Sequence, residues 1–391
     1  MTFQTASLFP MNIESARLAE LMPAIGGLIQ PVAAIQKWQA ELSATPLWLL
    51  QTLLGVVSIA VCAVFLIGRS RFGREFWQVL KPCMGRRGAL QTLAVSLLMI
   101  VLLLTEIRLY VLNTFLNSSA YSAMQDRLAD VFWKAVLINA ALMMIRSVNL
   151  IINDFLDQAL AIKWSEQLNR VLTENWLARK NYYRLQMRRD APDNIDQRIQ
   201  MDAQDFIVST ITFSRGMLNS IVSTIEFTIV LWGLAGILPV FGFEIPHGIV
   251  FLVYIAILAA TALAMWIGKP LIRSNYENEH LNGDYRYSLV RIRDHSESIA
   301  FYNGEWQEEK QLKERFRAIV RNRWRIARQS IGLSGFNDVF SQIMQLLPLM
   351  LQAPRLFTGQ IKIGDVQQTV QSFARLQKSM SFFRNFYKDF T

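Results

Sequence analysis

Five stretches of the sequence are each long and apolar enough to cross a bilayer as a helix. They span residues 47–68, 89–112, 131–153, 217–241 and 248–267. A bilayer core requires about 20 apolar residues in helical form, because backbone polar groups must bond to one another where water is absent. The composition agrees, since 52% of the residues are hydrophobic and only 18% are charged. The sequence therefore predicts an all-α membrane protein.

Two stretches nearer the C-terminus are helical in pattern but more polar. Residues 336–352 carry Asp338 and three glutamines, including Gln342 and Gln345, and residues 364–390 are amphipathic. Polar spanning helices are tolerated where they border water or pack inside a bundle. We therefore expect seven spans, the last two beside a water-accessible cavity that Asp338, Gln342 and Gln345 face.

The distribution of positive charge predicts the orientation. Segments 69–88, 154–216 and 269–335 hold six, nine and thirteen Lys and Arg residues, whereas the alternate connections are poor in both. Because cytoplasmic loops carry an excess of Lys and Arg, these three segments are predicted to be cytoplasmic. The N-terminus is then periplasmic and the C-terminus cytoplasmic. The formal net charge of +10 needs no nucleic acid to explain it.

The sequence contains two cysteines, which are too few for a disulfide framework. Its three histidines lack the Cys/His spacing of a metal site. The first 43 residues lack the pattern of a signal peptide and are predicted to be retained. They either cap the outer mouth of the cavity or form a periplasmic appendage without functional contact.

Both long cytoplasmic segments are predicted to be helical hairpins. Apolar residues recur at spacings of three and four over 155–186 and 306–330. Helices of this kind run straight out of the membrane, and about 20 residues project about 30 Å. The polar tips are predicted at 188–204 and at 295–309, the latter with a break at Asn303-Gly304.

Residues 69–84 are predicted to form an amphipathic helix on the inner membrane surface. Phe72, Phe76, Trp77 and Leu80 would face the bilayer, with the arginines at the phosphates.

Charged residues inside the predicted spans must face a cavity or a partner, because a lone charge in lipid is costly. Glu226 is either a proton acceptor or substrate contact, or a carboxylate paired with Arg146 inside the bundle. Glu106 and Arg108 lie two residues apart, do not face each other on a helix, and are each predicted to point to interfacial water.

Two motifs carry a family resemblance. NIDQRIQMD (194–202) and DYRYSLVRIRDHSESIAFYNGE (284–305), the latter preceded by GKPLI (268–272), resemble signature segments of the transmembrane domains of ABC transporters related to the peroxisomal fatty-acyl subfamily D. Bacterial half-transporters of the YddA type and peptide importers of the SbmA/BacA type belong to the same group. The resemblance covers roughly residues 76–391, with Ile195 standing where the family commonly has proline.

The resemblance implies an exporter-type (type IV) transmembrane domain of six long helices over 85–391. Residues 1–84 would then add an N-terminal extracytoplasmic segment, an extra span and an interfacial elbow helix. Both hairpin tips would contact a nucleotide-binding domain. At the first tip the implied contacts are Asn194, Asp196, Gln197, Arg198 and Asp202. At the second they are Glu297, Ile299, Ala300, Phe301, Tyr302 and Gly304.

The polar string at the second tip has two interpretations. An apolar knob on a short helix, ringed by charges, can seat in a groove of a partner and transmit motion. Alternatively, the hairpin is merely solvated and its aromatic residues pack on neighbouring helices. Spacing alone favours the solvated hairpin, and the family resemblance favours the coupling element.

The sequence contains no G-x-x-x-x-G-K-[ST] phosphate loop, since the Gly268-Lys269 pair follows a spanning helix and precedes Pro270. ATP and Mg²⁺ are therefore implied only for a nucleotide-binding domain absent from this chain, and no cofactor is expected within it. Either the sequence is the membrane half of a longer polypeptide, or it is a stand-alone, proton-coupled peptide importer of the SbmA/BacA type.

The resemblance implies a homodimer in a bacterial inner membrane that moves an amphipathic or peptide-like solute by alternating access. Acyl-CoA, peptides and cobalamin-like molecules all fit it, as does either direction of transport. A membrane scaffold without transport is a third possibility, disfavoured by the polar final helices.

Overall fold

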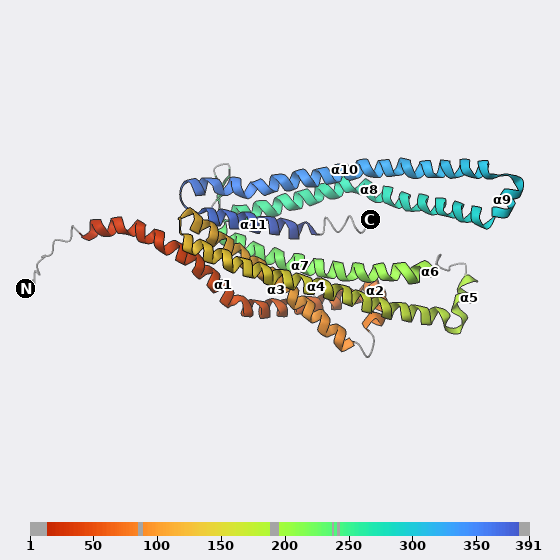
Figure 1. The fold of residues 1–391 in the computed structure, drawn as a ribbon, viewed down its shortest axis with the longest axis horizontal. Coiled ribbons are helices and arrows are strands. Elements are labelled where there is room, and N and C mark those ends of the chain that lie inside the picture. The colour runs from red at the N-terminus through yellow and green to blue at the C-terminus, as the bar shows by residue number, and fades with distance from the viewer. Residues whose placement is uncertain (1–13, 85–88, 188–194, 237, 241–242, 383–391) are drawn as a thin grey trace, which may run out of the picture. The chain divides into compact units, whose positions relative to one another are not determined.

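A computed structural model describes residues 14–84, 89–187, 195–236, 238–240 and 243–382. The described chain is almost entirely helical, as the ribbon in Figure 1 shows. It divides into two compact units. The first takes in the residues up to Val222 together with Ala353–Ser372, and the second takes in Ser223–Gln352 and the residues from Phe373.

The first unit contains the N-terminal helices and the first of the two helical hairpins. Its elements are α1 (Glu14–Arg69), α2 (Arg71–Met84), α3 (Ala89–Gln125), α4 (Ala129–Leu177), η1 (Ala178–Lys180), α5 (Asn181–Gln186), α6 (Ile195–Gln197), η2 (Arg198–Asp202), most of α7 (Ala203–Leu234) and the first half of α11 (Ile363–Met380).

The second unit contains the second helical hairpin. Its elements are the end of α7, the strands β1 (Leu238–Val240) and β2 (Phe243–Ile245), α8 (Gly248–Asp294), α9 (Ser296–Tyr302), most of α10 (Glu305–Phe357) and the end of α11. The two strands pair antiparallel, with Pro239 opposite Glu244.

Five helical stretches are long and apolar enough to cross a membrane, which confirms the five strong spans predicted from the sequence. They are Lys37–Leu66, Leu90–Gln125, Ala129–Leu185, Ile195–Leu234 and Gly248–Asp294. The two polar C-terminal stretches are also helical, within α10 and α11, and neither reaches the same apolarity.

Three helices of the two hairpins are far longer than a bilayer is thick. α4, α8 and α10 contain 49, 47 and 53 residues. At 1.5 Å per residue each is about 70–80 Å long, whereas the hydrocarbon core is about 30 Å thick. This length is consistent with the prediction that the helices continue beyond the membrane.

The fourth predicted span, 217–241, is wrong at its C-terminal end. α7 stops at Leu234, and residues 238–240 form a strand. Gly236 and Pro239 follow the last helical turn, and both residue types end helices.

The helix α2 packs one side on α4 and α7. Its Leu80 and Cys83 belong to a buried cluster with Leu160, Trp164, Leu168, Ile207 and Ile211. Cys83 has no exposed surface, and burial raises the pKa of its thiol, so the thiol stays protonated at neutral pH.

The four apolar residues predicted to face the bilayer from α2 divide into two pairs. Leu80 is buried and Phe76 packs against the same cluster, whereas Phe72 and Trp77 are 71% and 45% exposed. The amphipathic helix itself is confirmed. Half of its apolar face belongs to the protein core, and Phe72 and Trp77 remain free of it.

The helix α1 is held on α3 by a buried arginine. The side chain of Arg108 is 4% exposed, and its Nη2 donates hydrogen bonds to Glu41 Oε2 at 2.6 Å and to the Glu41 carbonyl at 2.7 Å. Its Nε donates to Thr45 Oγ1, and the guanidinium lies 5.4 Å from the centre of the Trp48 ring. The prediction that Arg108 points to interfacial water is wrong, because α1 supplies its partners. Glu106 is half-buried.

The start of α11 approaches the end of α3 closely. A Cβ atom added to Gly364 would lie 2.1 Å from the Ser118 carbonyl oxygen and 2.3 Å from Ser122 Oγ. Lys362 forms an ion pair with Asp126 at the same end of the two helices. Glycine is therefore required at position 364 for this helix pair.

Replacing this glycine should destabilise the protein. We expect Gly364→Ala to cost about 1–3 kcal/mol, because the methyl group meets backbone rather than a flexible side chain. The loss should be measured as a lower Tm of the purified protein in detergent. Gly283→Ala is the matched control, since a Cβ at Gly283 meets nothing within 4 Å. Equal Tm values for the two variants would contradict the close approach.

Removing one partner of Arg108 should also destabilise the protein. We expect Glu41→Met to cost about 2 kcal/mol, less than a fully buried pair because Glu41 is 37% exposed. The double variant Glu41→Met with Arg108→Met should lose less than the sum of the two single variants, because no buried charge then remains. Additive losses in Tm would show that the two residues are not coupled.

Candidate functional site

Side-chain hydrogen bonds join α8 and α10 along the second hairpin, which Figure 1 shows as two long helices running side by side to α9. Four residues donate across it: Arg291 to Glu308 and Gln311, Arg315 to the Asp284 carbonyl, Asn322 to the Ser274 carbonyl, and Arg325 to Glu277. Asn322 is only 3% exposed, and its bond to Ser274 measures 2.8 Å. The hairpin therefore has a fixed register.

The second tip is the short helix α9. The chain turns at His295 and again at Asn303, whose φ of 49° lies in the left-handed region. The Gly304 N–H donates to the Ile299 carbonyl at 3.0 Å, and the Asn303 N–H donates to the Ala300 carbonyl at 3.4 Å. These two bonds form a Schellman motif, which confirms the predicted break at Asn303-Gly304.

Two aromatic side chains protrude from α9. Phe301 is 82% exposed and Tyr302 is 81% exposed, and their rings lie edge to face with centroids 5.6 Å apart. Of the other residues predicted at this tip, Glu297 and Ala300 are exposed, whereas Ile299 is half-buried beside Gly304. The exposed apolar surface therefore comes from the aromatic pair, and Ile299 serves the turn.

The first tip begins with a break that the sequence did not predict. α4 ends at Leu177, and Arg179 and Lys180 both adopt left-handed φ angles of 52° and 62°. The Asn181 side chain then donates to the Asn175 carbonyl at 2.9 Å, which satisfies one carbonyl at the helix end. The continuous helix predicted over 155–186 is therefore wrong at 178–180.

The chain returns from the first tip through a π-turn. α6 is followed by the π-helical segment η2, and α7 continues directly from it. Three residues of this helical segment are exposed: Asp196, Arg198 and Asp202. Gln197 in the same segment is half-buried. The remaining predicted residue, Asn194, lies outside the described residues.

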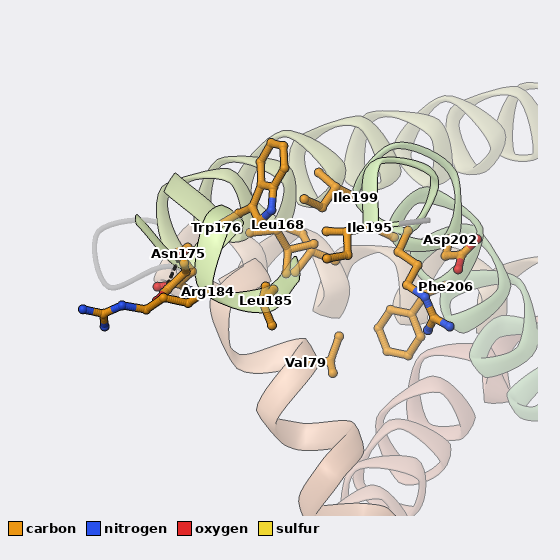
Figure 2. Close-up of a pocket in the computed structure, with 14 residues that line it drawn as sticks. Val79, Leu168, Asn175, Trp176, Arg184, Leu185, Ile195, Ile199, Asp202 and Phe206 are labelled. Carbon is orange, nitrogen blue, oxygen red and sulfur yellow. Dashed lines mark hydrogen bonds between the residues drawn. The ribbon is translucent and has the colours of Figure 1, made fainter. Parts of the chain in front are cut away.

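A cavity of about 700 Å³ lies at the base of this tip (Figure 2). Residues of α2, α4, α5 and the continuous segment from α6 through α7 line it: Val79, Leu168, Leu172, Asn175, Trp176, Asn181, Arg184, Leu185, Ile195, Arg198, Ile199, Asp202, Ala203 and Phe206. Arg198 and Asp202 thus belong both to the predicted contact motif and to the cavity wall. The sequence did not predict the cavity, because its walls come from four separate segments.

The residues predicted to line a cavity within the membrane fall on three helices. Glu226 in α7 is buried, at 7% exposure. Arg146 in α4 places its guanidinium 4.8 Å from the centre of the Tyr110 ring. Asp338, Gln342 and Gln345 in α10 are all exposed on the second unit.

The first unit contains a cluster of amide side chains that the sequence analysis did not predict. Asn113 donates to Asn139, Asn139 donates to Asn117, and Asn117 donates to both Asn113 and Gln371. These bonds join α3, α4 and α11 through side chains that can also bond to water or to a polar solute. Asn113 and Asn117 lie one helical turn apart, which is the signal that could have identified the cluster.

The described residues include no group of three or more His, Cys, Asp or Glu placed to hold a metal ion. The site as a whole thus offers exposed aromatic contacts at one tip, charged contacts at the other, and buried polar groups within the helices.

Comparison with known proteins identifies the architecture. Residues 79–357 match the family model of the ABC transporter transmembrane region 2. The chain is 46% identical to an ABC transporter ATP-binding protein of Haemophilus influenzae over 354 residues, which are 90% of this chain and 60% of that protein. It is 28% identical to the inner membrane ABC transporter ATP-binding protein YddA of Escherichia coli over 78% of this chain and 55% of the relative.

A more distant relative, ABC transporter D family member 2 of Arabidopsis thaliana, is 31% identical over 57% of this chain and 30% of its own length. The chain therefore spans between 30% and 60% of the length of these relatives. The apolar helices and the family match together make it a multi-pass membrane protein, an all-α transporter domain of the exporter type. The chain belongs to the ABC transporter transmembrane region 2 family.

Proposed function

We propose that this chain is the membrane module of a homodimeric half-transporter, driven by ATP hydrolysis in an ATP-binding domain outside its sequence. ATP and Mg²⁺ would be bound by that domain. The observation that carries the proposal is the exposed Phe301–Tyr302 pair at the end of a braced hairpin. The names of the relatives, which include ATP-binding proteins longer than the matched region, support it.

A motor domain in water can move a membrane helix only through an element stiff enough to transmit force. The bonds across α8 and α10 give the second hairpin that stiffness, and α9 turns across its end. Exposed aromatic residues are strong anchors in protein interfaces, because they bury large area with few rotatable bonds. We infer that Phe301 and Tyr302 seat in a groove of the ATP-binding domain, with Glu297 beside them.

The polar face of α10 supports a second copy of the chain. An aspartate at the centre of a spanning helix costs about 2.5–3.5 kcal/mol when it faces lipid. Asp338 and the two glutamines that follow it are exposed on the second unit, so they require water or another protein surface. Two copies enclosing a solvated route would supply both, and the inner and outer ends of that route would open alternately.

The groups available to such a route favour an amphipathic or peptide-like solute. Amide side chains such as those of Asn117 and Asn139 can donate and accept hydrogen bonds with a polar group of a solute. We place the module in a bacterial inner membrane with a periplasmic N-terminus and a cytoplasmic C-terminus, in accord with the positive charge of the hairpins.

The buried carboxylate of Glu226 favours a second candidate function, proton-coupled peptide import without ATP. A carboxyl group shielded from water within a span is the usual carrier of a proton in transporters.

The coupling role of α9 can be tested in a protein that joins this chain to its proposed ATP-binding domain. Phe301→Ala with Tyr302→Ala should lower solute-stimulated ATP hydrolysis about thirtyfold, because losing an aromatic anchor commonly costs about 2 kcal/mol or more of binding. The Tm should not change, since both rings are exposed. Tyr276→Ala, which removes a 76% exposed aromatic residue elsewhere on α8, should leave ATP hydrolysis intact. Full activity of the double variant would refute the coupling role.

The two candidate functions differ in their energy source. In proteoliposomes without ATP, we expect no solute uptake in response to an imposed pH gradient. Uptake that does occur, is lost in Glu226→Gln and persists in Glu106→Gln would favour proton coupling, because Glu106 is a half-buried carboxylate on another helix. Uptake that is unchanged in Glu226→Gln would remove Glu226 from any proton path.

A further inference from the structure

The cavity at the base of the first tip has the size and lining of a ligand site. Its volume of about 700 Å³ falls within the roughly 300–1,000 Å³ of small-molecule pockets. Nine of its fourteen lining residues are apolar, among them Leu168, Ile199 and Phe206. Water gains little in such a space, because it finds few polar partners there. An apolar group of matching size is the better occupant.

One hydrogen-bond donor of the cavity wall is unused. The indole Nε1 of Trp176 is buried and finds no acceptor among the residues that the structure describes. In Figure 2 the Trp176 ring stands at one side of the cavity, with this nitrogen on the side of Leu168. A buried donor without an acceptor is unfavourable, so a ligand oxygen at this point would be stabilising.

The charged residues of the cavity lie at its rim. Arg184, Arg198 and Asp202 are all exposed, which gives the rim a net charge of +1 from two cations and one anion. Figure 2 shows the Arg184 side chain extending away from the apolar residues. An anionic group held at this rim would remain in water while an attached apolar chain entered the cavity.

The cavity also borders the interfacial helix. Val79 of α2 forms part of its wall, and the same helix exposes Phe72 and Trp77 outside the protein core. Amphipathic helices with exposed aromatic residues of this kind lie at the level of the lipid headgroups. A ligand could thus come from the inner leaflet as well as from the cytoplasm.

We propose that this cavity binds an anionic amphiphile with a single acyl chain inside it. The chain would pack among the apolar lining residues, an ester or carboxylate oxygen would accept the Trp176 N–H, and the anionic group would lie near Arg198. A free fatty carboxylate and an anionic phospholipid share this chemistry. The residues that line this cavity are not those assigned to the proposed solute route, and the proposal does not depend on that route.

Photoaffinity labelling of the purified full chain in nanodiscs tests the site. The probes are a diazirine fatty acid, a diazirine phosphatidylglycerol and a diazirine phosphatidylcholine, and the labelled peptides are mapped by mass spectrometry. We expect one or both anionic probes to label residues 168–185 and 195–206, and the zwitterionic probe to label them much less. Labelling by the fatty acid alone identifies a free carboxylate, and labelling by phosphatidylglycerol identifies a phospholipid.

Substitutions that fill the cavity should abolish this labelling. Ala203→Phe and Ile199→Trp are each expected to reduce it about tenfold, because added bulk in an apolar pocket excludes the chain. Trp176→Phe should weaken it several-fold, since only the donor is lost. Met201→Phe is the matched control, because Met201 is 55% exposed and lies outside the lining. Thermal unfolding verifies that each variant folds.

Either of two results would overturn the proposal. The first is labelling that persists in both folded filling variants, which would mean that the probes bind elsewhere. The second is equal labelling by phosphatidylcholine and the anionic probes, which would remove the role of the rim charges.

Discussion

The buried hydrogen bond from Asn322 to the Ser274 carbonyl is the contact on which the alignment of α8 and α10 most depends. Outside the hydrocarbon these two helices have no lipid around them to keep them aligned. An amide left unpaired in that position would cost about 1–3 kcal/mol, so sliding one helix along the other is strongly opposed. The exposed pair of Arg325 with Glu277 joins the same two helices and adds little energy. These two contacts therefore determine where α9 lies relative to α8 and α10.

The five apolar spans could be predicted because each requires a long apolar run, and such runs are visible in a sequence. The break at Arg179 and Lys180 could not, since neither residue type favours a left-handed φ and no glycine or proline marks the site. The ion pair of Arg108 was equally hidden, because Glu41 is 67 positions away in the sequence. Local patterns predict elements, whereas contacts between elements depend on packing.

The candidate site shows the same division. The motif around Phe301 predicted the second tip and its break, because turn signals at Asn303 and Gly304 are local. The cavity beside Trp176 and the amide cluster around Asn117 are assembled from separate helices. No single stretch of the sequence therefore predicts either of them. The roles of the tip residues came from family resemblance and remain proposals, while their exposure and hydrogen bonds are properties of the structure.

The π-turn of η2 has a mechanical consequence for the first tip. A π-turn accommodates one residue more than an α-turn, so it stores a single extra residue between α6 and α7. If the segment tightened to α-helical geometry, everything on its far side would rotate by about 100° and advance by about 1.5 Å along the axis. Such a change would rotate the face of α6 that carries Ile195 while α7 kept its position.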